Sequence, residues 1–408
     1  MIIDKKIISK VQELTKFYLD KIIKIRETIH ANPELGWEEK ETSKLIQSEL
    51  KKKNIPFTLV RNIGIIGLIK GTQKSNKKEK TILLRADMDA LPLQEEVKIS
   101  YASKVKNKMH ACGHDAHTAN LLGCALILND MKNQFSGNIK LMFQPSEEVG
   151  EGGAKPMIDA GILKNPTVDA AIGLHVSGST EIGNIELSRG KSSAAVDDFK
   201  ITINAVGGHV SRPHNSANPC FIASQFVAGI NSIIDKAVNP LKLPLVGICV
   251  IRGGEEGANN VIPTSTFIEG TTRSFDNSIR KDIPKIMEKY LQGLCLSAPT
   301  KATYKIDYLF LYPPLINDDK MVDLIYDVST NLLGKNKFHY KPEGFGAEDF
   351  AYLTQNVPSV FYYVGVKDPK NKTQCCSVHS GTFSFDSKQF FTTAIPTMVI
   401  SALEYLLK

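Results

Sequence analysis

The sequence has no long uncharged hydrophobic segment, because nowhere do about 18 apolar residues follow one another, as a membrane-spanning helix requires. Its first residues, "MIIDKKIISKVQEL", interrupt the apolar positions with charges every few residues and contain no signal-peptide core. These two absences predict a cytoplasmic protein that has no membrane partner.

Cysteine is scarce, with seven residues spread over 408 positions. An odd number at wide spacing argues against a framework of disulfides. Four cysteines stand in apolar surroundings and are predicted to be buried as small hydrophobic residues: Cys124, Cys220, Cys249 and Cys295. The Cys375-Cys376 pair allows no assignment, and Cys112 belongs to a denser cluster discussed below.

Dense basic runs are also few, although the formal net charge is +7. The two runs, at 51–53 and 74–80, contain no aromatic residues, and we interpret them as solvated loops and not as a nucleic-acid surface. The remaining composition is typical of a globular protein. A chain of this length exceeds what one compact core usually holds, so two domains are expected.

Strand and helix patterns alternate in the first half of the chain. Helical spacing covers residues 7–53, with a break near Asn32-Pro33, and returns at 117–131. The predicted strands are short apolar runs at 63–71, 81–89, 138–145 and 168–176. This alternation predicts an α/β domain with a mixed sheet covered by helices.

The pattern changes between residues 195 and 309. The order becomes strand, helix, strand, strand, helix, strand, which is typical of a split βαβ (ferredoxin-like) α+β domain. Helix–strand alternation then resumes. We therefore predict a catalytic domain formed by residues 1–194 and 310–408, with a smaller domain at 195–309 inserted into it.

The segment "MHACGHDAHT" (109–118) concentrates potential metal donors. Cys112 and His114 are alternate residues, and in an extended segment they would face the same way and could grip one ion or bridge two. His117 opens the next helical pattern, where a polar helix-start role is the simpler explanation. Taken alone, Cys-Gly-His could equally be a loop with a buried thiol.

Further donors follow predicted strands of the same domain. In "FQPSEEVGEGG" (143–153), Glu147 and Glu148 stand on the loop after a strand, where α/β sheets place active sites. One adjacent carboxylate could bind a metal while the other deprotonates a water. His175 in "GLHV" and His379 in "CCSVHSG" are uninformative singly, but the conjunction of all these residues favours a catalytic metal site.

Ten motifs occur in order and carry a family resemblance. They are "RETIHANPELGWEE", "RADMDALPLQEE", "MHACGHDAHTANLLG", "FQPSEE", "GLHV", "GGHVSRPH", "NNVIP", "GTTRSFD", "GAEDF" and "HSG". Over roughly residues 25–385 the chain resembles the M20 metallopeptidase family, specifically its amidohydrolase branch. That branch includes hippurate hydrolases, N-acyl-amino-acid amidohydrolases, indole-acetyl-amino-acid hydrolases and N-acetyldiaminopimelate deacetylases.

The resemblance implies a zinc-peptidase-like catalytic domain with two divalent cations per subunit, Mn, Zn, Co or Ni. The implied metal ligands are Cys112, His114, Glu148, His175 and His379. Glu147 would be the general base and proton shuttle. Asp87 and Asp89 would support the ligands from behind, by orienting them or a water.

The resemblance also implies roles for the inserted domain, as a lid and as the surface of a homodimer. His209 would stabilise the oxyanion when the lid closes, within its own subunit or across the dimer. Asn260 and Arg273 would hold the carboxylate of the substrate.

The expected reaction is metal-dependent hydrolysis of the amide bond of a small N-acyl amino acid, releasing a free amino acid and a carboxylic acid. Three alternatives stay open. They are a dipeptidase or carboxypeptidase of the same family, an N-acetyldiaminopimelate deacetylase, and a catalytically inactive metal-stabilised binding protein. No G-x-S-x-G motif indicates an acyl-enzyme.

Overall fold

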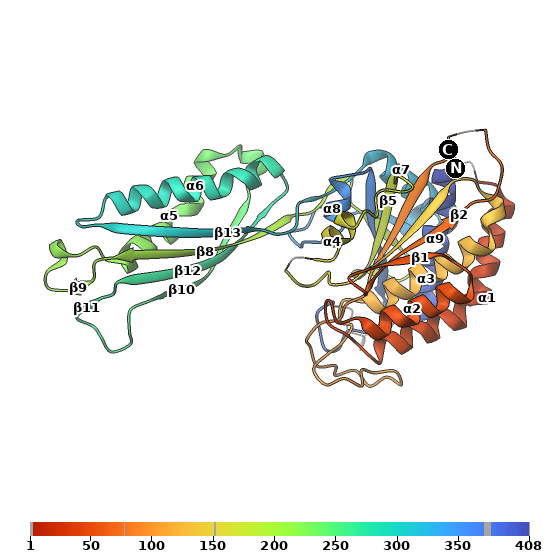
Figure 1. The fold of residues 1–408 in the computed structure, drawn as a ribbon, viewed down its shortest axis with the longest axis horizontal. Helices are drawn as coiled ribbons and strands as arrows, with labels where there is room; N and C mark the ends of the chain where they lie inside the picture. Colours follow the sequence, from red (N-terminus) through yellow and green to blue (C-terminus); the bar gives the residue numbers. More distant parts are fainter. Residues whose placement is uncertain (1–2, 77, 151, 371–376, 408) are drawn as a thin grey trace. The chain divides into compact units, whose positions relative to one another are not determined.

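The computed structural model describes residues 3–76, 78–150, 152–370 and 377–407, so Cys375-Cys376 lies outside the described residues. The chain forms two compact units (Figure 1). The larger unit comprises Met1–Ser192, Ile316–Pro342 and Asp349–Lys408, and the smaller unit comprises Ser193–Leu315 and Glu343–Glu348.

An eight-stranded mixed sheet forms the centre of the larger unit, in the order β1-β2-β4-β3-β5-β16-β6-β15. Its strands are β1 (Phe57–Val60), β2 (Gly64–Lys70), β3 (Thr81–Asp87), β4 (Asn138–Gln144), β5 (Ala170–Glu181), β6 (Ile185–Leu187), β15 (Phe338–Tyr340) and β16 (Ser359–Lys367). The four central strands β4, β3, β5 and β16 run parallel. Every residue of β3 and β4 is buried, which explains why these strands read as continuous apolar runs.

Helices cover the sheet on both faces, and the mixed α/β architecture predicted from the sequence is confirmed (Figure 1). The helices of this unit are α1 (Lys5–His30), α2 (Lys40–Lys52), α3 (His114–Asp130), α4 (Ala154–Asp159), α7 (Asp319–Leu333), α8 (Ala351–Thr354) and α9 (Ser387–Leu407). α3 and α9 pack against the sheet and against α1. α9 alone among the described helices is long and apolar enough to cross a membrane, and most of it is buried inside this unit, as in a core helix.

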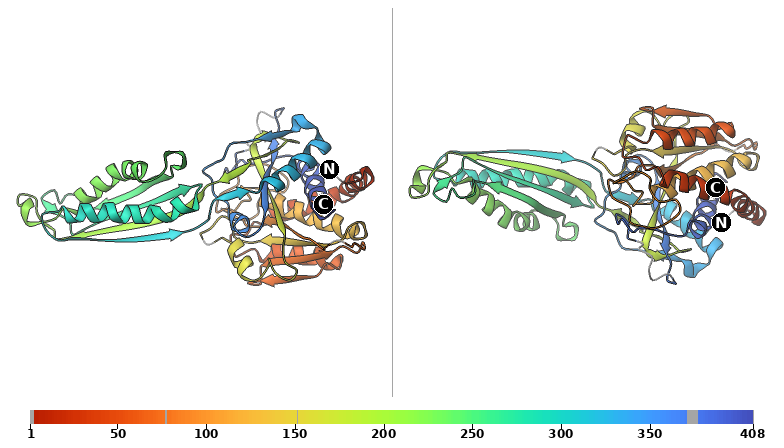
Figure 2. Two further views of the ribbon diagram at one scale, coloured as in Figure 1. Left: turned by 90° about the horizontal axis from the view of Figure 1, so that it is seen from above. Right: turned by 90° about the horizontal axis from the view of Figure 1, so that it is seen from below.

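The smaller unit has its own sheet and core (Figure 2). Its elements are β8 (Ala195–Ala205), β9 (Gly208–His209), α5 (Pro219–Ala237), β10 (Leu245–Gly253), β11 (Val261–Ile262), β12 (Ser265–Ser274), α6 (Asn277–Leu296) and β13 (Ala302–Phe310). The antiparallel sheet has the order β10-β12-β8-β13, and both helices contribute to one apolar core with it. The predicted order of strands and helices is therefore present.

Three details of the predicted burial and domain bounds are wrong. Cys220, predicted to be buried, is only partly buried. Cys249 is exposed, because it lies at a β-bulge in the edge strand β10, where the register shifts between Ile248 and Val250. Residues 310–315 and Glu343–Glu348 belong to the smaller unit and not to the catalytic domain. The second segment is held there by hydrogen bonds from Ala194 N to the carbonyls of Gly344 and Gly346.

Candidate metal centre

The carboxyl ends of the central parallel strands meet at one edge of the larger sheet, and donor residues gather there. β3 ends at Asp87, and β4 ends at Gln144, directly before the loop that carries Glu147 and Glu148. His175 lies within β5, in register with Tyr363 of β16. Strand topology thus brings together residues that are distant in the sequence.

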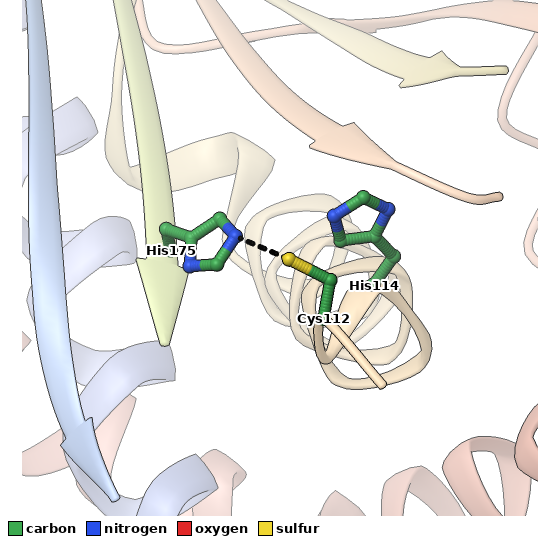
Figure 3. A group of neighbouring side chains, drawn as sticks. All are labelled: Cys112, His114 and His175. Atoms are coloured by element: carbon green, nitrogen blue, oxygen red, sulfur yellow. Dashed lines mark hydrogen bonds between the residues drawn. The ribbon is translucent and has the colours of Figure 1, made fainter. Parts of the chain in front are cut away.

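Cys112 and His114 approach the same edge from the start of α3 (Figure 3). The expectation that they lie in an extended segment is wrong. Gly113 has a left-handed φ of 83°, and the helix begins at His114, three residues earlier than predicted. The tight turn at Gly113 still allows both side chains to reach the centre, where Cys112 Sγ lies 3.3 Å from His175 Nε2.

The five predicted ligands converge. Donor atoms of Cys112, His114 and His175 lie within 4.8 Å of one another, and the same holds for Cys112, Glu148 and His379. Glu147 is close to two of these residues, His114 and Glu148, by the same measure. These distances are short enough for a shared cation centre and leave Glu147 beside it.

The chemistry of these donors fits a divalent cation. His114 Nε2 and Glu148 Oε1 are buried without a hydrogen-bond partner, although His379 Nε2 lies 3.2 Å from that oxygen. Buried polar atoms rarely stay unpaired. Burial raises the pKa of the Cys112 thiol and lowers that of His175. A bound cation would favour the thiolate and use the neutral imidazole.

Asp89 holds two of the predicted site residues from behind. Its Oδ1 accepts from Nδ1 of His114 at 3.1 Å, which leaves Nε2 of that ring directed to the centre. Its Oδ2 accepts from the backbone N of Glu148 at 2.9 Å. The supporting position expected for Asp89 therefore agrees with its contacts.

Both ring nitrogens of His117 are hydrogen-bonded within the protein. Its Nδ1 donates to Asp87 Oδ1 at 2.7 Å, and its Nε2 accepts from Val176 N at 3.0 Å. With both ring nitrogens satisfied, His117 has no lone pair left for a metal. It ties α3 to β3 and β5, which agrees with the simpler structural interpretation of this residue.

A buried ionic network lies below the centre, and the sequence analysis did not identify it. Arg85 donates to Asp87 Oδ2, to Gln144 and to Asp349, each at 2.8 Å. Asp349 also accepts from the backbone N of Gly153 and of Ala154 at 2.9 Å. The network thereby anchors the far end of the Glu147–Glu148 loop. The sequence does contain one sign of this network, because a charged arginine within the apolar run "TILLRAD" requires buried partners.

Glu39, at the start of α2, is the second residue that was missed. Its Oε1 accepts from Ser146 N at 2.8 Å, next to the glutamate pair, and its Oε2 is buried without a partner. Burial, reinforced by the charge of Asp89, raises the pKa of Glu39 to about 8. Burial thus favours the protonated form of the carboxyl group that holds the start of the Glu147–Glu148 loop.

The smaller unit contains the other three predicted site residues. His209 on β9 pairs with Val261, and Val210 N donates to Asn260 O at 3.0 Å, so His209 and Asn260 are neighbours. Arg273 lies near the opposite end of the ten-residue strand β12. At about 3.3 Å per residue, that strand separates Arg273 from Asn260 by more than roughly 20 Å. The expectation that both residues hold one substrate carboxylate stays a prediction, and this distance bears on whether one chain could supply both.

Comparisons with known proteins agree with this geometry. The model of peptidase family M20/M25/M40 matches residues 83–394. The chain belongs to this family. It is 36% identical to thermostable carboxypeptidase 2 of Saccharolobus solfataricus, over 93% of this chain and 94% of that protein. It is also 36% identical to IAA-amino acid hydrolase ILR1-like 4 of Arabidopsis thaliana, over 91% and 82%.

Among solved structures, the YXEP protein of Bacillus subtilis is described as a dinuclear metal-binding peptidase of the M20 family. It is 29% identical to this chain, with a TM-score of 0.82 over 96% of this chain and 99% of the other. Membership of the M20 family and the fold class expected from the sequence are thus confirmed.

Proposed function

We propose that this M20 protein hydrolyses the amide bond of N-acyl amino acids and uses two divalent cations held by Cys112, His114, Glu148, His175 and His379. The convergence of these five side chains beside a second glutamate, Glu147, carries the proposal. Mn, Zn, Co and Ni all accept this set of thiolate, imidazole and carboxylate donors.

When bound, the cations would supply a Lewis acid for the acyl oxygen and acidify the attacking water. The protein's own groups would move the proton. Glu147 would take it from the water and return it to the leaving nitrogen, which departs as the free amino acid. Asp89 would keep Nε2 of His114 in place throughout.

The separation within the smaller unit supports a homodimer in which two copies share each site. Asn260 and His209 are neighbours, whereas Arg273 is remote from both on the same chain. We propose that Arg273 binds the substrate carboxylate and that His209 and Asn260 act on the substrate held by the other copy. His209 would then stabilise the oxyanion.

A carboxypeptidase or dipeptidase is the second candidate, because one relative is named a carboxypeptidase. Both reactions break an amide next to a free carboxylate and differ in the group on the acyl side. An inactive binding protein is disfavoured because Glu147 is present and lies among the predicted ligands.

The deciding experiment loads the enzyme with each of the four metals and ranks kcat/KM over a substrate panel. The panel holds N-acetyl, N-benzoyl and indole-acetyl amino acids, N-acetyldiaminopimelate and dipeptides. We expect the highest values for N-acyl amino acids and no turnover after chelation. Higher values for dipeptides would favour the carboxypeptidase alternative.

A further inference from the structure

A cavity of about 540 Å³ opens beside the metal centre, and the described residues that line it belong to the larger unit. His175 forms one wall, and Ser377 and Val378, directly before His379, form another. Its volume far exceeds that of an acetyl group and is within the range of pockets that hold medium-sized organic groups. The cavity is therefore placed to receive a part of the substrate that is joined to the reacting carbonyl.

The floor of the cavity follows one row across the sheet. His175 of β5 is in register with Tyr363 of β16, and Tyr363 is in register with Glu186 of β6. Residues paired directly on neighbouring strands point to the same face. A continuous row of side chains thus leads away from the predicted ligand His175.

A lysine is fixed above this row. Lys341 Nζ lies 3.7 Å from the centroid of the Tyr363 ring and 3.4 Å from Glu186 Oε1. Glu186 also accepts from Ser177 Oγ at 2.8 Å. The carboxylate of Glu186 is thereby bonded to two groups of the protein itself. The ammonium of Lys341 is held in position by Tyr363 and Glu186 before any substrate binds.

A second lysine has no such partner. Lys367, the last residue of β16, is exposed, lines the cavity and forms no ion pair within the described ranges, although Glu181 is its cross-strand neighbour. Of the charged groups on the row and the cavity wall, two are lysines and one is the internally bonded Glu186. The rim of the cavity thus carries the Lys367 ammonium, which has no ion-pair partner among the described residues, and Val176, Tyr363 and Val378 add apolar surface to the lining.

We propose that this cavity is the acyl subsite and that it selects acyl groups ending in a carboxylate, such as succinyl or glutaryl. The inference rests on the proposed function, in which the smaller unit holds the amino-acid carboxylate and leaves the acyl part to this cavity. Methylene groups would lie along Tyr363, and the terminal carboxylate would accept from Lys367 and Lys341. Hydrolysis would then release a dicarboxylic acid and the free amino acid.

The test compares isosteric substrates of the metal-loaded enzyme, N-succinyl-L-leucine against N-succinamoyl-L-leucine and the two glutaryl counterparts. The members of each pair differ only in a terminal carboxylate or amide. We expect kcat/KM to be about tenfold or more higher for the carboxylates, the scale of a charge-assisted hydrogen bond. Lys367→Met should bring this ratio close to one, mainly through KM.

Two further variants test whether the effect on the carboxylate-to-amide ratio is specific to Lys367. Lys320→Met removes an exposed lysine on α7 of the same unit and should leave the ratio as in the wild type. Lys367→Glu should reverse the preference toward N-(4-aminobutyryl)-L-leucine, which ends in an ammonium group.

A ratio near one in the wild-type enzyme, or a ratio that Lys367→Met leaves unchanged, would overturn the acyl-subsite inference. Turnover of N-acetyl-L-leucine in that experiment would show that the proposed function survives. Absence of turnover with every N-acyl substrate would instead overturn the proposed function, and the inference with it.

Discussion

Two of the three predicted histidine ligands, His114 and His175, have Nδ1 fixed by the protein and Nε2 left for the site. His175 Nδ1 donates to Val176 O at 2.7 Å, and His114 Nδ1 donates to Asp89. Both rings therefore present Nε2. The fixed Nδ1 proton leaves a lone pair on Nε2 of these two predicted ligands. His117 differs, because both of its ring nitrogens are hydrogen-bonded within the protein.

Glu147→Gln separates base catalysis from metal binding. The amide keeps the size of the side chain but cannot take a proton, so kcat should fall about 10²- to 10⁴-fold or more while metal content is unchanged. Metal analysis after dialysis and steady-state kinetics measure the two effects. Glu13→Gln on the exposed face of α1 is the matched control. Near-normal turnover of the Glu147→Gln variant would exclude Glu147 as the base.

Glu39→Gln tests the protonated carboxyl beside the catalytic loop. The folded-state pKa is raised to about 8 from 4.5, so the unfolded chain releases a proton that the folded chain retains. The wild type should therefore lose stability relative to the variant as pH rises from 4.5 to 8, by an amount on the order of a few kcal/mol. Denaturant unfolding across this range measures it. Parallel stability curves for the two proteins would contradict the assignment.

At the scale of elements, the loop after β4 is the critical one. Its start is held by Glu39 at Ser146 and its end by Asp349 at Gly153 and Ala154. Between these anchors, Asp89 holds the backbone of Glu148. Three acceptors from distant parts of the chain, Glu39, Asp89 and Asp349, thus fix the loop that carries the glutamate pair.

Gly153→Ala should disturb this loop. A Cβ at Gly153 would lie 1.7 Å from the carbonyl oxygen of Pro145. The two ends of the loop would therefore have to move apart. We expect metal affinity and kcat/KM to fall by about tenfold or more. Gly293→Ala, where a Cβ meets nothing within 4 Å, is the control. A Gly153→Ala enzyme with wild-type metal affinity would show that the loop is not held as described.

Much of this architecture could be predicted from the sequence, for reasons that differ between elements. Buried parallel strands such as β3 and β4 read as continuous apolar runs, and the motifs identified the donors. The turn at Cys112–His114 could not be predicted, because a left-handed Gly113 shortens an apparently extended segment by starting the helix early. The partners of Arg85 and Glu39 were equally hidden, since burial and pairing depend on residues far away in the chain.

At the scale of the whole molecule, two units with separate apolar cores divide the work. The larger unit contains all five predicted ligands and Glu147, and the smaller unit contains His209, Asn260 and Arg273, whose roles are proposals. The distance along β12 indicates that residues of one smaller unit cannot all serve one substrate. The proposed sharing of each site between two copies would reconcile this distance with a single bound substrate.

Mixing two inactive variants tests this sharing. Glu147→Gln lacks the base and His209→Ala lacks the oxyanion donor, so each homodimer should be inactive. After dissociation and reassociation of equal amounts, half of the dimers would contain one chain of each kind and one intact site, restoring roughly a quarter of the wild-type activity. No recovery, with dimer exchange verified by differently tagged chains, would contradict a shared site.

The central claim is that Cys112, His114, Glu148, His175 and His379 bind one metal centre. The most direct measurement is a crystal structure of the metal-loaded protein with anomalous scattering collected at the absorption edge of the metal. We predict two anomalous peaks bounded by these five side chains, with Cys112 Sγ at a bonding distance of about 2.3 Å if the metal is zinc. Peaks elsewhere, or a centre that excludes Cys112, would contradict the account.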